Sequence, residues 1–342
     1  MKKERESNFE LLRIIAQFMI IYYHILYFAI YPVAGHEIYK ALWFPPHVGV
    51  PVFVMISGYF GIRPSIKGLV KYIGLVLVLS IPYMIEQTMV GIDGGGIKFL
   101  FNLPFFLSLT PFWFVRTYFF LYLFSPVINK YLKDITPFQR LLLLVVLLYM
   151  GVYIGVLGAD ASLKDGKNLI SFLLFYTIGD TLKSYKGIWE KWNMKYLITL
   201  YVIFNAAVVL LFSIVGFGRI SDAIWLRIFF AYYSPILLIN SVWLFVIFGK
   251  IHIHSAFINH VGKASLAMYI LHGTFLFNLI VPTALSLYNN NSMVIGVLLS
   301  IALLTLLIIA LCVMVYDMLI PIWKWVNKIG DILERRAIFF KG

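Results

Sequence analysis

The first hydrophobic segment of the chain holds two residues that a membrane helix has little reason to carry. Arg13 and His24 lie eleven positions apart in this segment. An ionisable side chain inside a bilayer costs at least about 2.5 kcal/mol, so it usually faces a protein interior or an aqueous cavity. At ~1.5 Å per residue, His24 lies about 16 Å beyond Arg13 along the helix. If Arg13 marks the cytosolic edge, His24 is near or just past the middle of the ~30 Å hydrocarbon layer. A neutral imidazole there can accept a proton from a hydroxyl group.

Two further residues have the spacing or the depth to work with this pair. Glu10 precedes Arg13 by one helical turn, so the two side chains can pair on one face. His272 lies about 12 Å into the ninth hydrophobic segment and reaches a depth similar to that of His24. Structural alternatives remain open for each. Arg13 can be an edge charge that extends to the cytosol, and either histidine can be a hydrogen-bonding residue between helices.

The second hydrophobic segment contains a short polar motif. Ser57 and Tyr59 flank Gly58, which permits the close approach of a neighbouring helix. A serine nucleophile needs an adjacent base, and none is evident in the sequence, so we expect a structural role for Ser57. His47 follows two prolines at the outer end of this segment and is predicted to be a solvated loop residue.

Other candidates are less specific. Trp113 and Arg116 open the fourth segment from the outside, and Arg116 either extends to solvent or meets an anionic or polyhydroxyl ligand. Three histidines of one loop are interpreted as solvated rather than metal-binding, because no acid or cysteine lies near them: His252, His254 and His260. The single cysteine, Cys312, is expected to be a small core residue, and no metal site is predicted.

Composition determines the fold class. Hydrophobic residues make up 62% of the chain and charged residues 13%, which predicts an all-α, polytopic integral membrane protein. The net charge of +13 is scattered between hydrophobic segments, so it does not indicate nucleic-acid binding. About ten transmembrane helices are expected, at 10–31, 47–62, 69–90, 112–132, 141–158, 168–182, 196–216, 226–249, 264–287 and 292–322.

The sequence predicts one transmembrane domain followed by a short tail. Residues 1–322 are predicted to form a single transmembrane domain, and residues 323–342 a cytosolic amphipathic tail on the inner leaflet. The apolar stretch Phe99–Leu109 is too short to span and contains Pro104, so we expect a re-entrant or interfacial piece on the outer side.

The basic residues predict the orientation of these segments. With the N-terminus inside, seven of the 28 lysines and arginines fall outside and the other 21 fall on the cytosolic side. The outer seven are Lys40, Lys98, Arg116, Lys164, Lys167, Arg219 and Arg227. Because positive residues concentrate in cytoplasmic loops, both termini are predicted to be cytosolic.

Four motifs, in order along the chain, resemble those of the membrane acyltransferase-3 family. The first is Phe9-Glu10-Leu-Leu-Arg13 with His24 further on, and the second is Phe53-x-x-x-Ser57-Gly58-Tyr59-Phe60. The third is Trp113-Phe114 with Leu121-Tyr-Leu-Phe-Ser125-Pro126, and the fourth is Tyr269-Ile-Leu-His272. The resemblance covers essentially the whole chain.

This resemblance implies an enzyme of the bacterial plasma membrane. Family members move an acyl group, usually acetyl, from cytosolic acyl-CoA to a hydroxyl of a surface glycan or a lipid-linked sugar. The resemblance implies that His24 is catalytic and Arg13 its partner, with possible support from Glu10, His272, Ser57 and Tyr59. It also implies that Arg63, Lys67 and Lys71 face the phosphates of acetyl-CoA, although topology alone explains basic residues there. Trp113 and Arg116 are the candidates for acceptor binding.

Two other function classes stay open. A transporter or flippase of a lipid-linked saccharide would grip sugar with Arg116 and the outer aromatic residues, but it is expected to need paired broken helices. A glycan polymerase usually demands a large outer loop, and the longest outer loop here has about 20 residues, from Gly91 to Pro111.

Overall fold

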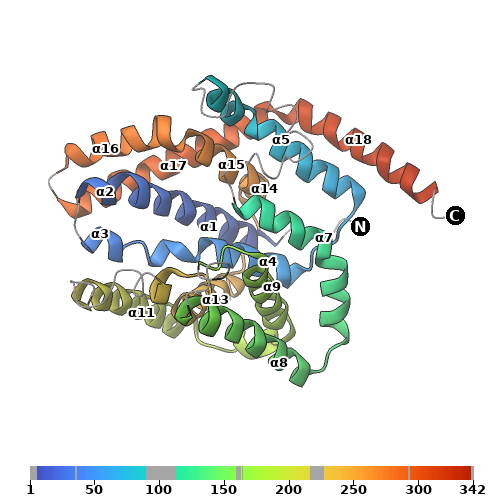
Figure 1. The fold of residues 1–342 in the computed structure, drawn as a ribbon, viewed down its shortest axis with the longest axis horizontal. Coiled ribbons are helices and arrows are strands. Elements are labelled where there is room, and N and C mark those ends of the chain that lie inside the picture. Colours follow the sequence, from blue (N-terminus) through green and yellow to red (C-terminus); the bar gives the residue numbers. More distant parts are fainter. Residues whose placement is uncertain are drawn as a thin grey trace.

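A computed structural model of the chain describes residues 6–34, 37–89, 113–158, 163, 165–215, 227–291 and 293–339. Every regular element in these ranges is helical (Figure 1). The long helices are α1 (Ser7–Ile25), α4 (Gly49–Phe60), α5 (Ile66–Met89), α7 (Trp113–Asp134), α8 (Pro137–Leu148), α9 (Leu169–Ser184), α11 (Met194–Val215), α13 (Pro235–Gly249), α15 (Ser265–Phe275), α17 (Val294–Met318) and α18 (Ile320–Phe339). Shorter ones are α2 (Tyr31–Ala34), α3 (Glu37–Ala41), α10 (Lys186–Trp189), α14 (Ala256–Lys263) and α16 (Val281–Asn289). The predicted all-α class is confirmed.

Six helical stretches of the described chain are long and apolar enough to cross a membrane. They are Ser7–Ala34, Ile66–Tyr83, Pro137–Leu157, Met194–Ile214, Arg227–Gly249 and Val294–Met318. A seventh is counted if the helices Ser265–Thr274 and Asn278–Asn289, which meet at 68°, form one broken span. The remaining three predicted segments are also helical, as α4, α7 and α9. The protein is therefore a multi-pass membrane protein, while the stretch Phe99–Leu109 lies outside the described residues.

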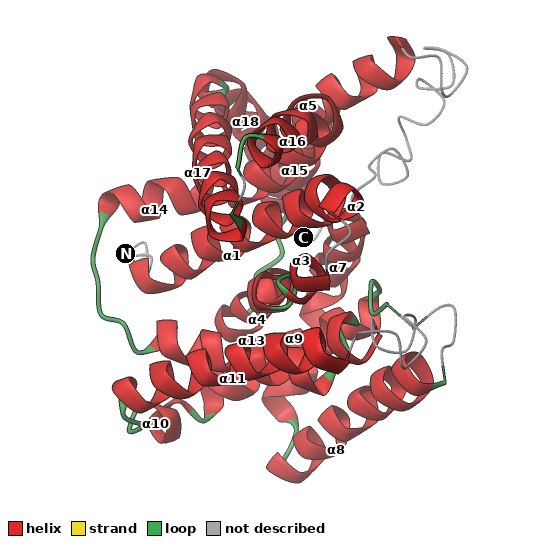
Figure 2. Ribbon diagram, turned by 90° about the vertical axis from the view of Figure 1, so that its left-hand side faces the viewer, coloured by secondary structure: helices red, strands yellow, loops and turns green. Residues whose placement is uncertain are grey.

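Helix α1 occupies the middle of the molecule, between two groups of helices (Figures 1 and 2). One group contains α5, α15, α16, α17 and α18, and the other contains α4, α8, α9, α11 and α13. Residues of α1 contact α4, α13, α14, α15 and α17. The first helix is thus enclosed by protein, which explains how it can carry ionisable residues.

The closest helix pair in the second group depends on two glycines. A Cβ atom on Gly58 of α4 would lie 2.0 Å from the carbonyl oxygen of Tyr176 in α9. Conversely, a Cβ atom on Gly179 of α9 would lie 2.1 Å from the carbonyl oxygen of Met55 in α4. The glycine in the Ser57-Gly58-Tyr59 motif is therefore a helix-contact residue, as the sequence predicts.

The end of α4 turns sharply and leads into the segment that contains Arg63. Gly61 has φ of +72°, a backbone conformation that favours glycine. The next residue is held from both sides: the Ile62 amide donates to the Tyr176 hydroxyl (2.8 Å), and Asn129 donates to the Ile62 carbonyl (2.7 Å). These hydrogen bonds hold the backbone in place where the segment that contains Arg63 begins.

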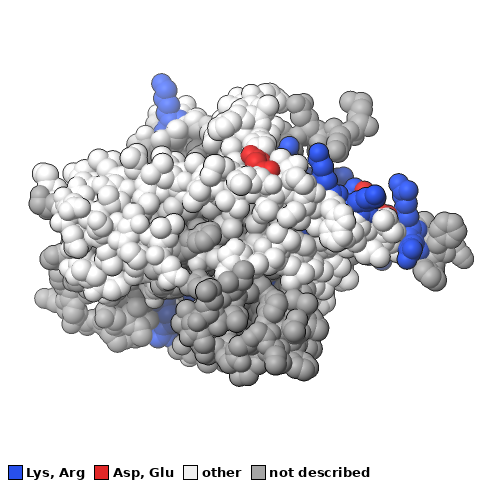
Figure 3. All heavy atoms as spheres, turned by 90° about the horizontal axis from the view of Figure 1, so that it is seen from above, with Lys and Arg blue, Asp and Glu red and all other residues white. Residues whose placement is uncertain are grey.

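The C-terminal helix begins at Ile320, three residues before the predicted tail. It packs on α5 through the buried side chain of Val326, which lies against Gly74. The Trp323 ring stacks on Tyr316 of α17. Lys67 of α5 forms an ion pair with Asp331 of α18, at 2.6 Å. Figure 3 shows a broad face almost free of charge, with most of the visible basic side chains at one end.

We predict that Gly58→Ala destabilises the protein by roughly 1–3 kcal/mol, because the added methyl group forces α4 and α9 apart. Gly187→Ala is the matched control, since a Cβ atom there meets nothing within 4 Å. Thermal unfolding in detergent measures both. Equal melting temperatures for the two variants would contradict the assigned helix contact.

Candidate active site

Helix geometry changes within four residues after each of the two membrane histidines. His24 stands one residue before the end of α1, and the π-helical turn η1 (Leu26–Ile30) follows. His272 lies on α15, which is followed by the π-helical turn η5 (Leu276–Ile280) and then by α16. Such turns are rare and often occur at functional sites.

The two histidines are hydrogen-bonded to each other across 248 positions of sequence. Nδ1 of His24 lies 2.9 Å from Nε2 of His272, and the rings stack with centroids 5.1 Å apart. Nδ1 of His272 lies 2.9 Å from the carbonyl oxygen of Met268. A carbonyl oxygen only accepts, so Nδ1 of His272 carries the proton. In a neutral pair, Nε2 of His272 then accepts from Nδ1 of His24. Nε2 of His24 is left with a lone pair.

His24 lines a cavity of about 620 Å³, which we call the histidine cavity. Aromatic rings form much of its wall: Tyr23, Tyr27, Phe28, Tyr31, Trp43, Trp113, Phe230 and Tyr232. Three charged residues also line it, namely Asp165, Lys167 and Arg227. A cavity with aromatic faces and a few polar groups suits an amphipathic ligand such as a sugar.

The prediction for His47 is wrong. This residue is not a solvated loop side chain, because it lines the histidine cavity and only 7% of it is exposed. It lies in the 3₁₀ turn η2 (Pro45–Val48), where the imidazole stacks on Tyr232 with centroids 4.9 Å apart. Its Nε2 atom bonds the carbonyl oxygen of Phe230 at 2.8 Å. The hydrogen-bond partner, Phe230, lies 183 positions later in the chain, so the residues around His47 do not identify it.

The two residues predicted to open the fourth segment lie in different environments in the structure. Trp113 lines the histidine cavity together with His24. Arg116 is exposed on α7 and lines neither the histidine cavity nor the one described next. The prediction that Arg116 binds the acceptor therefore gains no support from its position.

A second cavity, of about 340 Å³, contains Arg13 and is called the arginine cavity. Arg63 and Lys71 line it as well, so three cationic side chains surround it. Its other walls include Ser57, Gly61, Tyr72, Tyr118 and Tyr122. A cluster of arginine and lysine side chains is the usual environment for phosphate groups.

The predicted pairing of Glu10 with Arg13 is present, as an ion pair between residues one turn apart on α1. Glu10 is only 3% exposed, so this carboxylate is held inside the protein beside Arg13. Lys67 differs from its predicted neighbours. It is paired with Asp331 and does not line the arginine cavity.

Neither hydroxyl of the Ser57-Gly58-Tyr59 motif contacts His24. The Ser57 hydroxyl lies 3.3 Å from the Phe53 carbonyl oxygen, to which it donates, and 3.1 Å from the Tyr118 hydroxyl. Tyr59 packs against Phe9 and Phe245 and lines neither cavity. Ser57 therefore belongs to the arginine cavity and Tyr59 to the packing of α1, α4 and α13.

The two cavities approach each other along α7. Trp113 lines the histidine cavity and Tyr118 the arginine cavity, and five residues of helix correspond to about 7.5 Å. Between them, Phe114 packs on Tyr118 with centroids 5.7 Å apart and on Tyr269 at 5.0 Å. Tyr269 in turn packs on His272, at 5.7 Å. We call Phe114, Tyr118 and Tyr269 the aromatic wall.

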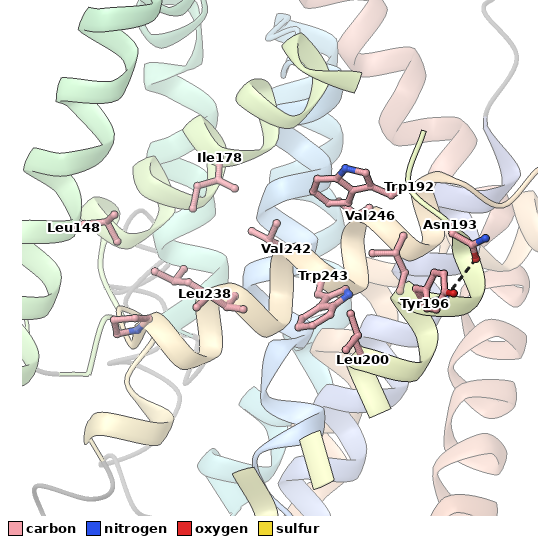
Figure 4. Close-up of a pocket in the computed structure, with 13 residues that line it drawn as sticks. Leu148, Ile178, Trp192, Asn193, Tyr196, Leu200, Leu238, Val242, Trp243 and Val246 are labelled. Carbon is pink, nitrogen blue, oxygen red and sulfur yellow. Dashed lines mark hydrogen bonds between the residues drawn. The ribbon is translucent and has the colours of Figure 1, made fainter. Parts of the chain in front are cut away.

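A further pocket, of about 630 Å³, has an apolar lining without the charged side chains and histidines that line the other two cavities. Figure 4 shows its lining, which comes largely from α11 and α13 and includes Trp192, Leu238 and Trp243. No acid, lysine, arginine or histidine lines it. Arg13 and His24, the pair singled out in the first hydrophobic segment, line the arginine and histidine cavities instead.

The loop histidines lie away from both cavities. His252 and His254 are exposed, and His260 on α14 pairs with Asp317 of α17 at 2.9 Å. In the ranges that the structure describes, no group of three or more His, Cys, Asp or Glu side chains is arranged to hold a metal ion.

Phe114 and Tyr269 of the aromatic wall stand in two of the quoted motifs, but their contact with Tyr118 and most of the lining of the histidine cavity were not predicted from the sequence. Lys167 and Arg227 appeared only as two of the outer basic residues, and Tyr232 was not singled out. The one available signal was that His47 directly precedes a continuous apolar run.

Comparison with known proteins identifies the family of the chain. A family model described as an acyltransferase domain, of the acyltransferase-3 type, matches residues 6–317. No curated protein and no solved structure matches the chain significantly. The matched region includes Arg13, both membrane histidines and the linings of both cavities. The chain belongs to the membrane acyltransferase-3 family.

Proposed function

We propose that this enzyme transfers an acyl group, most simply acetyl, from acyl-CoA to a hydroxyl of a cell-surface or lipid-linked glycan. His24 acts as the general base. The observation that carries this proposal is the chain of hydrogen bonds from Met268 through His272 to His24. It leaves one basic nitrogen, Nε2 of His24, in a residue that lines an aromatic cavity.

The proposed step balances without a further reactant. Nε2 of His24 takes the proton of the acceptor hydroxyl while the oxygen attacks the thioester carbonyl carbon. The tetrahedral intermediate collapses, the carbon–sulfur bond breaks, and the proton passes from His24 to the sulfur of CoA. An alternative route is a two-step transfer in which His24 itself is acylated first, and this route uses the same nitrogen.

The arginine cavity is the proposed binding site of the donor. Arg63 and Lys71 line it together with Arg13, which supports contacts to the phosphates of acyl-CoA. The narrow pantetheine arm would then have to pass the aromatic wall to bring the thioester to His24. Lys67 is left out of this site because it pairs with Asp331.

The histidine cavity is the proposed binding site of the acceptor. Its aromatic rings, including Trp113, suit the apolar faces of a sugar. Two basic residues assigned to the outer side by sequence, Lys167 and Arg227, line this cavity. Two assigned to the cytosolic side, Arg63 and Lys71, line the other. This agreement supports the proposed orientation, with both termini cytosolic.

We propose further that the enzyme lies in the bacterial plasma membrane, with residues 1–322 as one transmembrane domain and 323–342 as a cytosolic tail. A transporter or flippase of a lipid-linked saccharide is the alternative. The fold gives this alternative little support. A transporter is expected to have paired broken helices, and the described part of the chain has one sharply bent helix pair rather than two.

We predict that His24→Ala lowers acyl transfer by about 10²–10⁴-fold, because the base is lost. Sealed inside-out vesicles from the native host receive acetyl-labelled acetyl-CoA, and base-labile label is followed in the glycan fraction. His252→Ala at matched protein level is the control, since His252 is exposed in a loop. Transfer retained by His24→Ala would overturn the assignment.

His272 is predicted to act by positioning His24. His272→Leu removes the acceptor for Nδ1 of His24, and the loss of one buried hydrogen-bond partner, about 1–3 kcal/mol, corresponds to a decrease of roughly 5- to 150-fold in kcat. His272→Gln keeps an acceptor oxygen and should retain more activity than His272→Leu. Equal kcat values for the two variants would argue that His272 only fills space.

The arginine cavity gives a prediction about the donor. Arg63→Gln combined with Lys71→Gln should raise the KM for acetyl-CoA by at least about tenfold, because contacts to charged groups contribute about 1.5–3 kcal/mol each. The KM for the glycan should stay unchanged. Lys133→Gln, at the far end of α7, is the control. An unchanged KM for acetyl-CoA in the double variant would place the CoA phosphates elsewhere.

A further inference from the structure

The histidine cavity contains a second imidazole that the proposed step does not use. His47 enters it from η2, while His24 enters from α1. Two prolines, Pro45 and Pro46, begin the turn, and the backbone amide of His47 donates to the Phe44 carbonyl at 3.1 Å. The backbone that carries His47 is therefore held by local structure, and the ring sits among cavity residues.

Hydrogen bonding fixes which nitrogen of His47 holds a proton. Nε2 lies 2.8 Å from the carbonyl oxygen of Phe230, and a carbonyl only accepts, so Nε2 is the donor. In the neutral ring, Nδ1 then has a lone pair. Among the residues that the structure describes, Nδ1 has no hydrogen-bond partner.

Two aromatic neighbours hold the His47 ring in place. Tyr232 stacks on it with an interplanar angle of 11°, and Tyr23 meets it edge-on with centroids 4.8 Å apart. Tyr23 and Tyr232 line the same cavity. The imidazole cannot rotate without breaking its bond to Phe230, so its acceptor nitrogen is preorganised.

His24 and His47 thus have the same arrangement. Each uses one ring nitrogen to donate, His24 to His272 and His47 to Phe230, and each keeps the other nitrogen as an acceptor. A ligand that satisfies both acceptors must supply two O–H or N–H hydrogens. A sugar with two nearby hydroxyls does so, whereas a simple alcohol does not.

We infer that His47 is a positioning residue that accepts a hydrogen bond from a second hydroxyl of the acceptor. The acceptor is then a polyol in which one hydroxyl meets His24 and reacts while another is held by His47. This inference rests on the proposed function. It goes further because it makes His47 decide which hydroxyl is acylated.

Two substitutions separate this role from a purely structural one. His47→Gln can keep a donor near the position of Nε2, and so the link to Phe230, but it loses the acceptor at Nδ1. His47→Asn can keep an acceptor oxygen near the position of Nδ1 but loses the link to Phe230. His252→Gln is the matched control, because His252 is exposed in a loop.

The experiment uses the full-length enzyme in vesicles, acetyl-CoA, and the envelope glycan extracted from the native host. We measure KM for each substrate and locate the acetyl groups on the product by NMR. For His47→Gln we expect kcat/KM for the glycan to fall about 2- to 13-fold, the equivalent of one neutral hydrogen bond. The KM for acetyl-CoA stays unchanged, and acetyl groups spread over more than one hydroxyl. His47→Asn should retain the original acetylation position better.

Three outcomes would overturn the inference. If His47→Gln behaves like wild type while His47→Asn loses stability, His47 is only an anchor for Phe230. If both variants raise the KM for acetyl-CoA, His47 acts on the donor side. If wild-type enzyme transfers no label to the glycan, the proposed function itself fails. If wild-type enzyme transfers label and His24→Ala does not, the proposed function stands. The results for the His47 variants then test the role of His47 alone.

Discussion

The hydrogen bond between His24 and His272 is the interaction on which the site depends. It joins the first helix to α15 and pairs two imidazoles that would each be costly alone in a membrane. The cost is offset because Met268 supplies a carbonyl for the second ring. For this bond to form, α1 must lie inside the bundle, in contact with α15 and enclosed by the helices on its other side.

That central position divides the molecule into two chemical environments. Arg13 lines a cavity with Arg63 and Lys71, whereas His24, eleven residues later, lines one with aromatic walls. The first environment suits phosphates and the second suits sugars. Under the proposed function, the aromatic wall would keep the phosphates of the donor away from the acceptor. The part of the donor that crosses the wall would then have to be thin and uncharged, as the pantetheine arm is.

The features that depend on neighbouring residues could be predicted from the sequence. Runs of apolar residues predicted the helices, and a spacing of three residues predicted the Glu10–Arg13 pair. Prediction failed where a partner lies far away in the chain. His47 is buried because Phe230, 183 positions later, supplies a carbonyl. Lys67 does not line the arginine cavity, and it is paired with Asp331 of α18. The residues next to His47 and Lys67 in the sequence do not reveal these partners. The burial of His47, which follows two prolines, depends on tertiary packing.

The partner of His272 also constrains the chemistry. In a serine protease triad, a carboxylate both orients the imidazole and stabilises the imidazolium that forms. Here the chain ends on the carbonyl oxygen of Met268, which orients His272 but carries no full negative charge. A long-lived imidazolium at His24 would therefore have little compensation. Under the proposed mechanism, the proton must move on quickly from His24 to the departing sulfur, and His272 would aim the base rather than store charge.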